Sequence, residues 1–171
     1  MKNRIIIFLL YIFFFVPSLA ENLNIQSSSI TVDKKTKITI FKNQVSAKDK
    51  KNNQLLTEFA EYDKNLQLLK TVGKTTVLTS GGFVIEGEDI LFDNNENYIK
   101  SDKPATILDL EKNEIYLDGF QYSTSDGFFK SAGKIQIIDS KNNKYNFSQI
   151  YIDEKKKEIV GTDSKAFLNQ E

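Results

Sequence analysis

Apolar and polar residues alternate with a period of two along most of the chain beyond residue 20. One short phrase recurs at a fixed interval: an apolar residue, a variable one, a second apolar residue, and then an acidic or small polar one. Its five copies are Ile30–Asp33, Ala60–Asp63, Ile90–Asp93, Phe120–Ser123 and Ile150–Asp153. The alternation predicts strands with one buried face, and the fixed period predicts a stack of similar supersecondary units.

Clusters of turn-forming residues separate the alternating segments, and they also recur at the same period. One set comprises Asp33, Asp63–Asn65, Asp93–Asn97, Ser123–Gly127 and Asp153–Lys157. The other comprises Lys51–Asn53, Gly81–Gly82, Glu111–Asn113 and Lys141–Asn143. Each unit is therefore predicted to be a hairpin, which gives about ten antiparallel strands in all. Because the period is an even number, equivalent side chains in successive units should face the same side of the sheet.

Glycines near the middle of two of the longer predicted strands, Gly73 and Gly133, indicate bends. Pro104 lies beside the equivalent position of the third unit, where a missing N–H can be tolerated. Bent hairpins stack into a V with apolar columns between two facing sheets. Three of these columns are Val45–Thr75–Ala105–Ile135, Ala47–Val77–Ile107–Ile137–Phe167 and Leu55–Ile85–Ile115–Tyr145.

The composition excludes most kinds of catalysis and ligand chemistry. Of 171 residues, 40% are hydrophobic and 27% charged, and the formal net charge is zero, so no basic surface points to nucleic acid. The chain has no Cys, His or Trp, and its only Arg is Arg4. Thiolate nucleophiles, histidine bases and the usual metal ligands are therefore missing. We predict a protein that is not an enzyme and needs no cofactor or metal.

The N-terminal segment, 1–20, is predicted to be a cleaved signal peptide. Lys2 and Arg4 precede an apolar run from residue 5 to 16, followed by Pro17 and the small-residue site ending at Ala20. Twelve helical residues rise only about 18 Å, too short for a membrane core of roughly 30 Å. An uncleaved anchor is the alternative. The predicted organisation is thus a signal peptide over 1–20 and one β-domain over 21–171.

The repeat resembles that of the OstA-like domain. Ala60–Asp63, Gly87–Asp93 and Phe147–Asp153 are similar to its "A-x-x-a-x-Y-D" phrase. The stretches Lys70–Gly73, Lys130–Gly133 and Glu158–Gly161 are similar to its "a-x-A-x-G-x-V" half. The resemblance covers nearly all of residues 25–168. It implies the LptA-type periplasmic fold of the lipopolysaccharide transport system, an open V-shaped β-jelly roll (β-taco) of about ten strands, as the alternation also suggests.

The resemblance further implies a function. In this family, apolar grooves carry the acyl chains of lipopolysaccharide across the periplasm towards the outer membrane, and neighbouring domains join through their strand edges. The closing stretch, residues 150–171, most resembles the N-terminal domain of the LPS-assembly protein LptD, whose outer-membrane barrel would lie in the same or another chain. A stand-alone LptA-like bridge protein is the other reading, and both stay open.

The candidates for acyl-chain contact are the inward-phase residues of the repeated phrase and of the opposing columns. They are Ile30, Val32, Ile90, Phe92, Phe120, Tyr122, Ile150 and Ile152, with Ile107, Ile137, Ile115 and Leu117 opposite. For each of them a sealed core is an equally good interpretation. The acidic pair Glu86 and Glu88 should face solvent, and Asp93–Asn97 should be a turn, since it lacks the glycine and the terminal glutamate of a calcium loop.

Two other classes of protein compete with this interpretation. A small outer-membrane β-barrel also combines a signal peptide with alternating strands, but bacterial barrels need aromatic girdles, and a strict repeat of this kind is not one of their features. A secreted β-solenoid used for structure or adhesion would run for more repeats and place Gly or Asn at each turn. Solubility without detergent would separate the first alternative from a periplasmic jelly roll.

Overall fold

The structure is a computed structural model that describes residues 23–169, and within that range it contains only β-strands and their connections. The predicted signal peptide lies outside the described residues. The strands are β1 (Leu23–Gln26), β2 (Ser29–Val32), β3 (Ile38–Asp49), β4 (Gln54–Asp63), β5 (Leu68–Thr71), β6 (Lys74–Leu78), β7 (Val84–Glu88), β8 (Leu91–Asp93), β9 (Tyr98–Ser101), β10 (Ala105–Leu108), β11 (Glu114–Leu117), β12 (Phe120–Ser123), β13 (Phe128–Ile138), β14 (Lys144–Asp153), β15 (Glu158–Thr162) and β16 (Lys165–Phe167).

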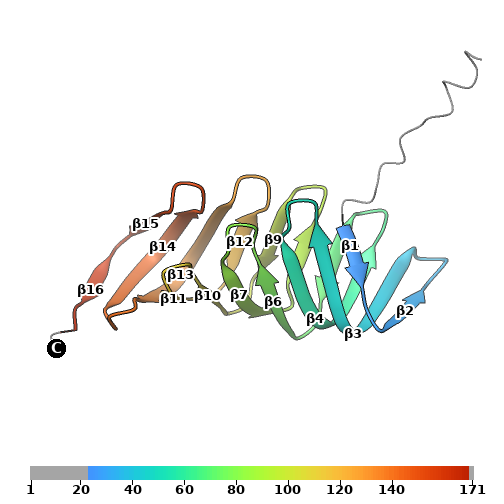
Figure 1. Ribbon diagram of the computed structural model, residues 1–171, viewed down its shortest axis with the longest axis horizontal. Helices are drawn as coiled ribbons and strands as arrows, with labels where there is room; N and C mark the ends of the chain where they lie inside the picture. The colour runs from blue at the N-terminus through green and yellow to red at the C-terminus, as the bar shows by residue number, and fades with distance from the viewer. Residues whose placement is uncertain (1–22, 170–171) are drawn as a thin grey trace, which may run out of the picture.

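The strands form one continuous antiparallel sheet that folds along its length into two facing layers (Figure 1). Layer I holds β2, β5, β8, β9, β12 and β15, and layer II holds β1, β6, β7, β10, β11 and β16. The long strands β3, β4, β13 and β14 run through both layers, since each pairs with strands of layer I at one end and layer II at the other. The twelve short strands are halves of six interrupted ones, so ten bent strands cross the described part of the molecule. The predicted all-β, V-shaped architecture of repeated hairpins is confirmed.

The bends lie where the repeat predicted them. The pairing register shifts between Lys42 and Val45 in β3 and between Ala132 and Ile135 in β13. Backbone with positive φ occurs at the equivalent position of four units, at Asn43, Gly73, Gly133 and Asp163. Gly133, at φ +108°, has a conformation that residues with a side chain rarely adopt. Bulges of this kind turn a strand sharply, which folds each hairpin into a V.

Buried hydroxyls bind the backbone at the bends, where the ladder is interrupted. Thr71 Oγ1 accepts a hydrogen bond from Ile90 N at 2.8 Å. The Ser101 hydroxyl donates to Glu88 O at 2.8 Å, and the hydroxyl of Ser131 donates to Gly119 O. Thr71, Ser101 and Ser131 occupy the same position in successive units, so the repeat supplies one hydroxyl to each of these bends. These bonds remove the cost of burying an unpaired carbonyl or amide inside the bend.

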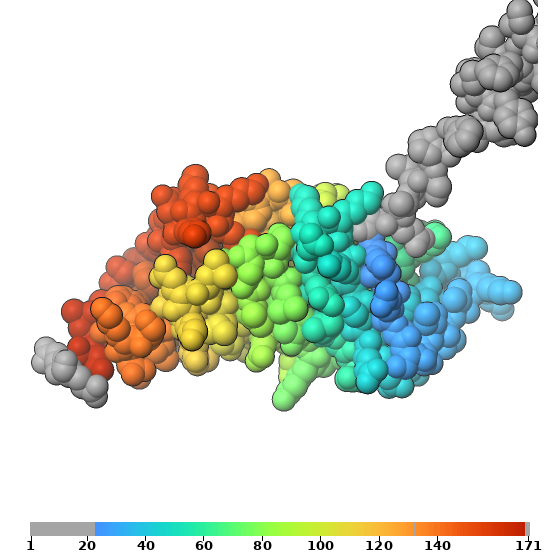
Figure 2. Space-filling view, in the orientation of Figure 1, coloured from blue at the N-terminus to red at the C-terminus, as the bar shows by residue number. Residues whose placement is uncertain are grey.

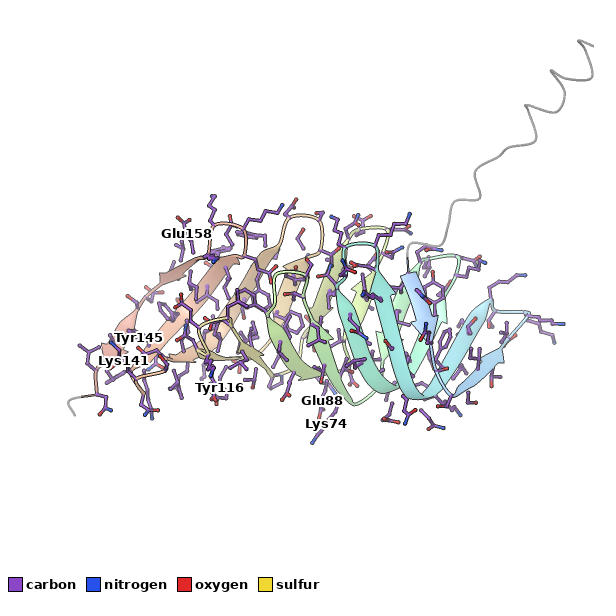
Figure 3. All side chains as sticks on the ribbon, in the orientation of Figure 1. Lys74, Glu88, Tyr116, Lys141, Tyr145 and Glu158 are labelled. Atoms are coloured by element: carbon purple, nitrogen blue, oxygen red, sulfur yellow. The ribbon has the colours of Figure 1, made fainter. Side chains whose placement is uncertain are left out.

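Turns line the opposite edge of each layer. In four of the five layer I turns, an aspartate accepts two backbone N–H groups, as Asp93 Oδ1 does from Asn95 (3.0 Å) and Glu96 (2.9 Å). Asp33, Asp63 and Asp153 repeat the arrangement. Asp93–Asn97 is therefore a turn, as predicted. In Figure 3, Lys74 and Glu88, which are paired on β6 and β7 next to the bends, lie at the lower edge, and Glu158, directly after a layer I turn, lies near the upper edge.

Candidate lipid-binding interior

Two apolar ladders run between the layers along the length of the molecule. In layer II, Cα partners link Ile25, Ala47, Leu55, Val77, Ile85, Ile107, Ile115, Ile137, Tyr145 and Ala166 in that order. In layer I, they link Val32, Thr39, Tyr62, Leu69, Phe92, Ile99, Tyr122, Phe129, Ile152 and Ile159. Each ladder has one member from every bent strand, which is the continuity expected from an even period.

Ten of the twelve candidate residues lie buried in this interior. They are Ile90, Phe92, Phe120, Tyr122, Ile150, Ile152, Ile107, Ile137, Ile115 and Leu117. The buried apolar side chains of both layers form a single cluster, in which Phe120 and Phe129 stack with ring centroids 5.4 Å apart. The structure therefore brings these ten together as a packed core.

The other two candidates, Ile30 and Val32, lie on β2 at the N-terminal end and are 56% and 58% exposed. Both residues occupy the same positions of the repeat as the buried candidates, but no further unit of the described chain covers their side of layer I. Figure 2 shows this end, in pale blue, at the right-hand edge of the coloured residues. At the C-terminal end, Ile159, Val160 and Phe167 on β15 and β16 are also exposed. Both ends of the described chain thus present an edge strand with apolar side chains.

Predicted polar positions behave as expected. Glu86 and Glu88 are exposed on the outer side of β7. Within residues 23–169, no three carboxylates gather in a group that could hold a metal ion. The same part of the chain contains no helix long and apolar enough to cross a membrane.

One carboxylate enters the region between the layers, and sequence reasoning missed it. Glu154, in the last layer I turn, accepts hydrogen bonds from the hydroxyls of Thr79 (2.6 Å) and Tyr122 (2.8 Å). Burial raises the pKa of Glu154 above its ordinary value, more than these two bonds lower it. Burial, followed by the charge of Glu154, raises the pKa of the Tyr122 hydroxyl, which therefore stays protonated. Because Thr79 belongs to a layer II turn, Glu154 bridges the two layers at the edge opposite the bends, which we call the mouth.

A cavity of about 330 Å³ lies in the mouth next to Glu154. Phe83, Leu110, Ile152 and Ile159 form its apolar walls. The charged groups around it are Asp109, Glu111, Glu154 and Lys157. Leu110 and Ile159 are 60% and 40% exposed, so the cavity opens to solvent.

Comparison with known proteins adds little. No protein-family model and no curated protein matches the chain. Among solved structures, it is similar to LptH, the LptA-homologous periplasmic component of the lipopolysaccharide transport device from Pseudomonas aeruginosa. The two share 12% sequence identity over 86% of this chain and 95% of the other, with a TM-score of 0.34. That score is too low for the similarity to show a common fold.

Proposed function

We propose that the protein is a periplasmic, non-catalytic carrier of lipopolysaccharide, which holds the lipid's acyl chains between the two layers on the way to the outer membrane. The observation that carries the proposal is the pair of ladders that run from the first bent strand to the last and are interrupted in their apolar character only at Thr39. Saturated chains can slide along such a surface, because every rung offers similar contacts and few offer a hydrogen bond that would hold the cargo in place.

The ten buried candidates then contact the cargo only when the layers separate. Each layer is held by its own hydrogen-bond ladder, so it can move as a unit about the bends while its strand pairing stays intact. In the closed state, core side chains fill the space that acyl chains would occupy. Exchanging one hydrocarbon surface for another changes the free energy of burial little.

Both ends are proposed to dock with similar jelly-roll domains of the transport system. β2 and β15 have a pairing partner on one side only, and a β-strand edge with free N–H and C=O groups is a template for a further strand. The exposed side chains of Val32 and Ile159 continue the layer I ladder to these edges. Docking would thus extend the apolar surface from one domain into the next. The resemblance of this chain to the N-terminal domain of LptD belongs to the same proposal, with an outer-membrane barrel in the same or another chain as a further partner.

Photo-crosslinking in cells tests the carrier function. A photoreactive amino acid at Phe92 or Phe120 should capture lipopolysaccharide, whereas one at Glu86, on the outer face of layer II, should not. The proposal fails if the interior positions give no adduct while the outer position does. Fractionation of the same cells checks the proposed export, because a cleaved signal peptide over 1–20 would deliver the protein to the periplasm.

A further inference from the structure

The layer II turns follow a common pattern with one exception. In three of them an aspartate and an asparagine four positions later make the same bonds, as Asp109 does with Asn113 N (2.8 Å) and Nδ2 (2.7 Å). The pairs Asp49–Asn53 and Asp139–Asn143 repeat this geometry. The remaining turn has Thr79 and Phe83 at the equivalent positions. This exceptional turn is the one that meets Glu154.

Thr79 suits this contact in a way that aspartate would not. Its hydroxyl accepts from Phe83 N at 3.0 Å, which replaces the aspartate's role in closing the turn, and it donates to Glu154 Oε1 at 2.6 Å. An aspartate here would place a second carboxylate against Glu154, where the two charges repel. The departure from the repeat thus keeps the turn and creates a donor towards layer I.

Glycines provide the space for the Glu154 side chain. A Cβ at Gly81 would lie 2.5 Å from Glu154 Cδ, and a Cβ at Gly127 would lie 3.2 Å from Oε2. Gly127 ends its layer I turn with positive φ, at a position where the other units have Lys37, Gln67, Asn97 and Lys157. Residues with side chains therefore adopt this backbone conformation in the other units. The glycine at position 127 is better explained by the space that Glu154 needs than by the positive φ.

The core and a third turn complete the contact. Tyr122 belongs to the layer I ladder, and its hydroxyl points out of the core to Glu154 Oε2 at 2.8 Å. Asn53, at the end of the first layer II turn, accepts from Ser80 N at 2.8 Å through its side-chain oxygen. Asn53 is fully buried, and its side-chain oxygen also accepts a longer bond from the Tyr122 hydroxyl, 3.4 Å. One carboxylate thus joins turns from opposite layers and from units far apart in the sequence.

We propose that Glu154 is a clasp that holds the mouth closed over the apolar interior and must release before an acyl chain can enter. This inference rests on the proposed carrier function and adds the element that controls access to it. The cavity beside Glu154, with Phe83, Leu110 and Ile152 in its walls, is where a hydrocarbon chain would first contact the protein. Once the carboxylate leaves Thr79, the two layers lose the side-chain bond that links them there and can open from this cavity.

Thiol reactivity tests the clasp without any lipid. The chain has no cysteine, so Ile152→Cys places a single reporter in the wall of the cavity. Adding Glu154→Ala should raise its rate of reaction with a water-soluble thiol reagent by about tenfold or more, because the hydrogen bonds that join Glu154 to Thr79 and Tyr122 are removed. Glu158→Ala, an exposed glutamate beside the same turn, is the matched control and should leave the rate unchanged.

A second reporter separates local opening from loss of the fold. Ala60 is fully buried in β4, away from the clasp, and Ala60→Cys should stay protected in the Glu154→Ala background. Equal rates at Ile152→Cys for the Glu154→Ala and Glu158→Ala backgrounds would overturn the proposal. So would a parallel rise at both reporters, which would show that Glu154 supports the whole fold and not the mouth.

A reversible lock tests the link to lipid entry. Gly81→Cys and Glu154→Cys place two thiols across the mouth from each other, since a Cβ at Gly81 would lie 2.5 Å from Glu154 Cδ, and mass spectrometry establishes that oxidation joins them in a disulfide. Purified protein with a photoreactive group at Phe92 should capture lipopolysaccharide after reduction but not while oxidised. Equal capture in both states would overturn the clasp. No capture even without the cysteines would instead contradict the carrier function, and the thiol experiment would still decide the clasp.

Discussion

The middle of the molecule and its N-terminal end carry the same residue at the same position of the repeat, with opposite outcomes. Ile30, Ile90 and Ile150 are equivalent in the repeat, yet Ile30 is 56% exposed and the other two are fully buried. Ile90 and Ile150 have a bent strand on either side, whereas β2 pairs only with β3. In this architecture, the alternation of apolar and polar residues determines which face of the sheet a side chain points to. That side chain is buried only where neighbouring units cover the face.

Truncation of the same side chain in both regions should give the largest difference between them. Ile90→Ala should lower the free energy of unfolding by about 2–5 kcal/mol, because it removes fully buried methyl groups and leaves a cavity. Ile30→Ala should lower it by less than about 1 kcal/mol, since little area is lost from the interior. Urea denaturation of both variants measures the difference. Equal losses would show that β2 is covered in solution.

A bend residue gives the next largest effect. Gly133 and Asp163 are equivalent in the repeat and both have positive φ, +108° and +52°. Gly133→Ala should cost about 1–3 kcal/mol, because alanine is strained at this φ. Its Cβ would also approach Asp118 Oδ2 to 3.2 Å. Asp163→Ala, at the C-terminal end, should cost clearly less. Thermal unfolding of the pair would contradict this prediction if the two midpoints fell equally.

Glu154 should add to the pH dependence of stability between about pH 4 and 8. Its pKa is raised above the ordinary value of 4.5, so the folded state holds the proton more tightly than the unfolded state. The contribution of this group to stability is therefore greatest below pH 4.5 and falls as pH rises through the raised pKa. Denaturation midpoints from about pH 4 to 8 should fall less steeply for Glu154→Gln.

Glu158→Gln is the control for this pH series and should follow the wild-type curve. The neighbouring charged groups Asp109, Glu111 and Lys157 stay in place in both variants, so they do not confound the comparison. Identical curves for the two glutamine variants would contradict the prediction that Glu154 contributes to the pH dependence of stability.

The smallest effect on stability is expected at the edge. Val32→Lys should change the free energy of unfolding by no more than about 0.5 kcal/mol, because the side chain is already exposed. It should, however, abolish docking at this end, since a lysine would interrupt the apolar surface proposed to continue into the partner. Thr31→Lys, on the outer side of the same strand, is the control. Sedimentation at increasing concentration, alone and with a jelly-roll partner, compares them.

The repeat made most of the fold predictable. An even period determined which residues of each unit face inward, and the glycines and turn residues located the bends and reversals. Gly73 and Gly133 lie at bends, and Asp93 closes a turn, as predicted. Local patterns are enough to predict the pairing of strands here, because neighbouring strands share the same alternation of inward and outward residues.

Two features could not be read from local patterns. The exposure of Ile30 and Val32 depends on where the stack of units ends, which the periodicity of a single unit does not contain. The Glu154 contact joins positions 75 residues apart across the mouth, and its geometry comes from the packing of both layers. The sequence nevertheless contained a signal. Thr79 and Phe83 replace the Asp–Asn pair of the other layer II turns, and Thr79 is the residue that binds Glu154.

The repeated unit also sets the physical length of the molecule. Duplicating one unit would add two strands to each layer and lengthen it by roughly 10 Å, given a strand spacing of about 4.8 Å. The apolar phase would survive such a duplication, whereas inserting an odd number of residues into a strand would turn the core residues beyond it towards water. Duplication before Thr79 or after Glu154 would leave the bond between them intact. Duplication between the two would separate the halves of the clasp, so the length of this protein can change freely only outside that segment.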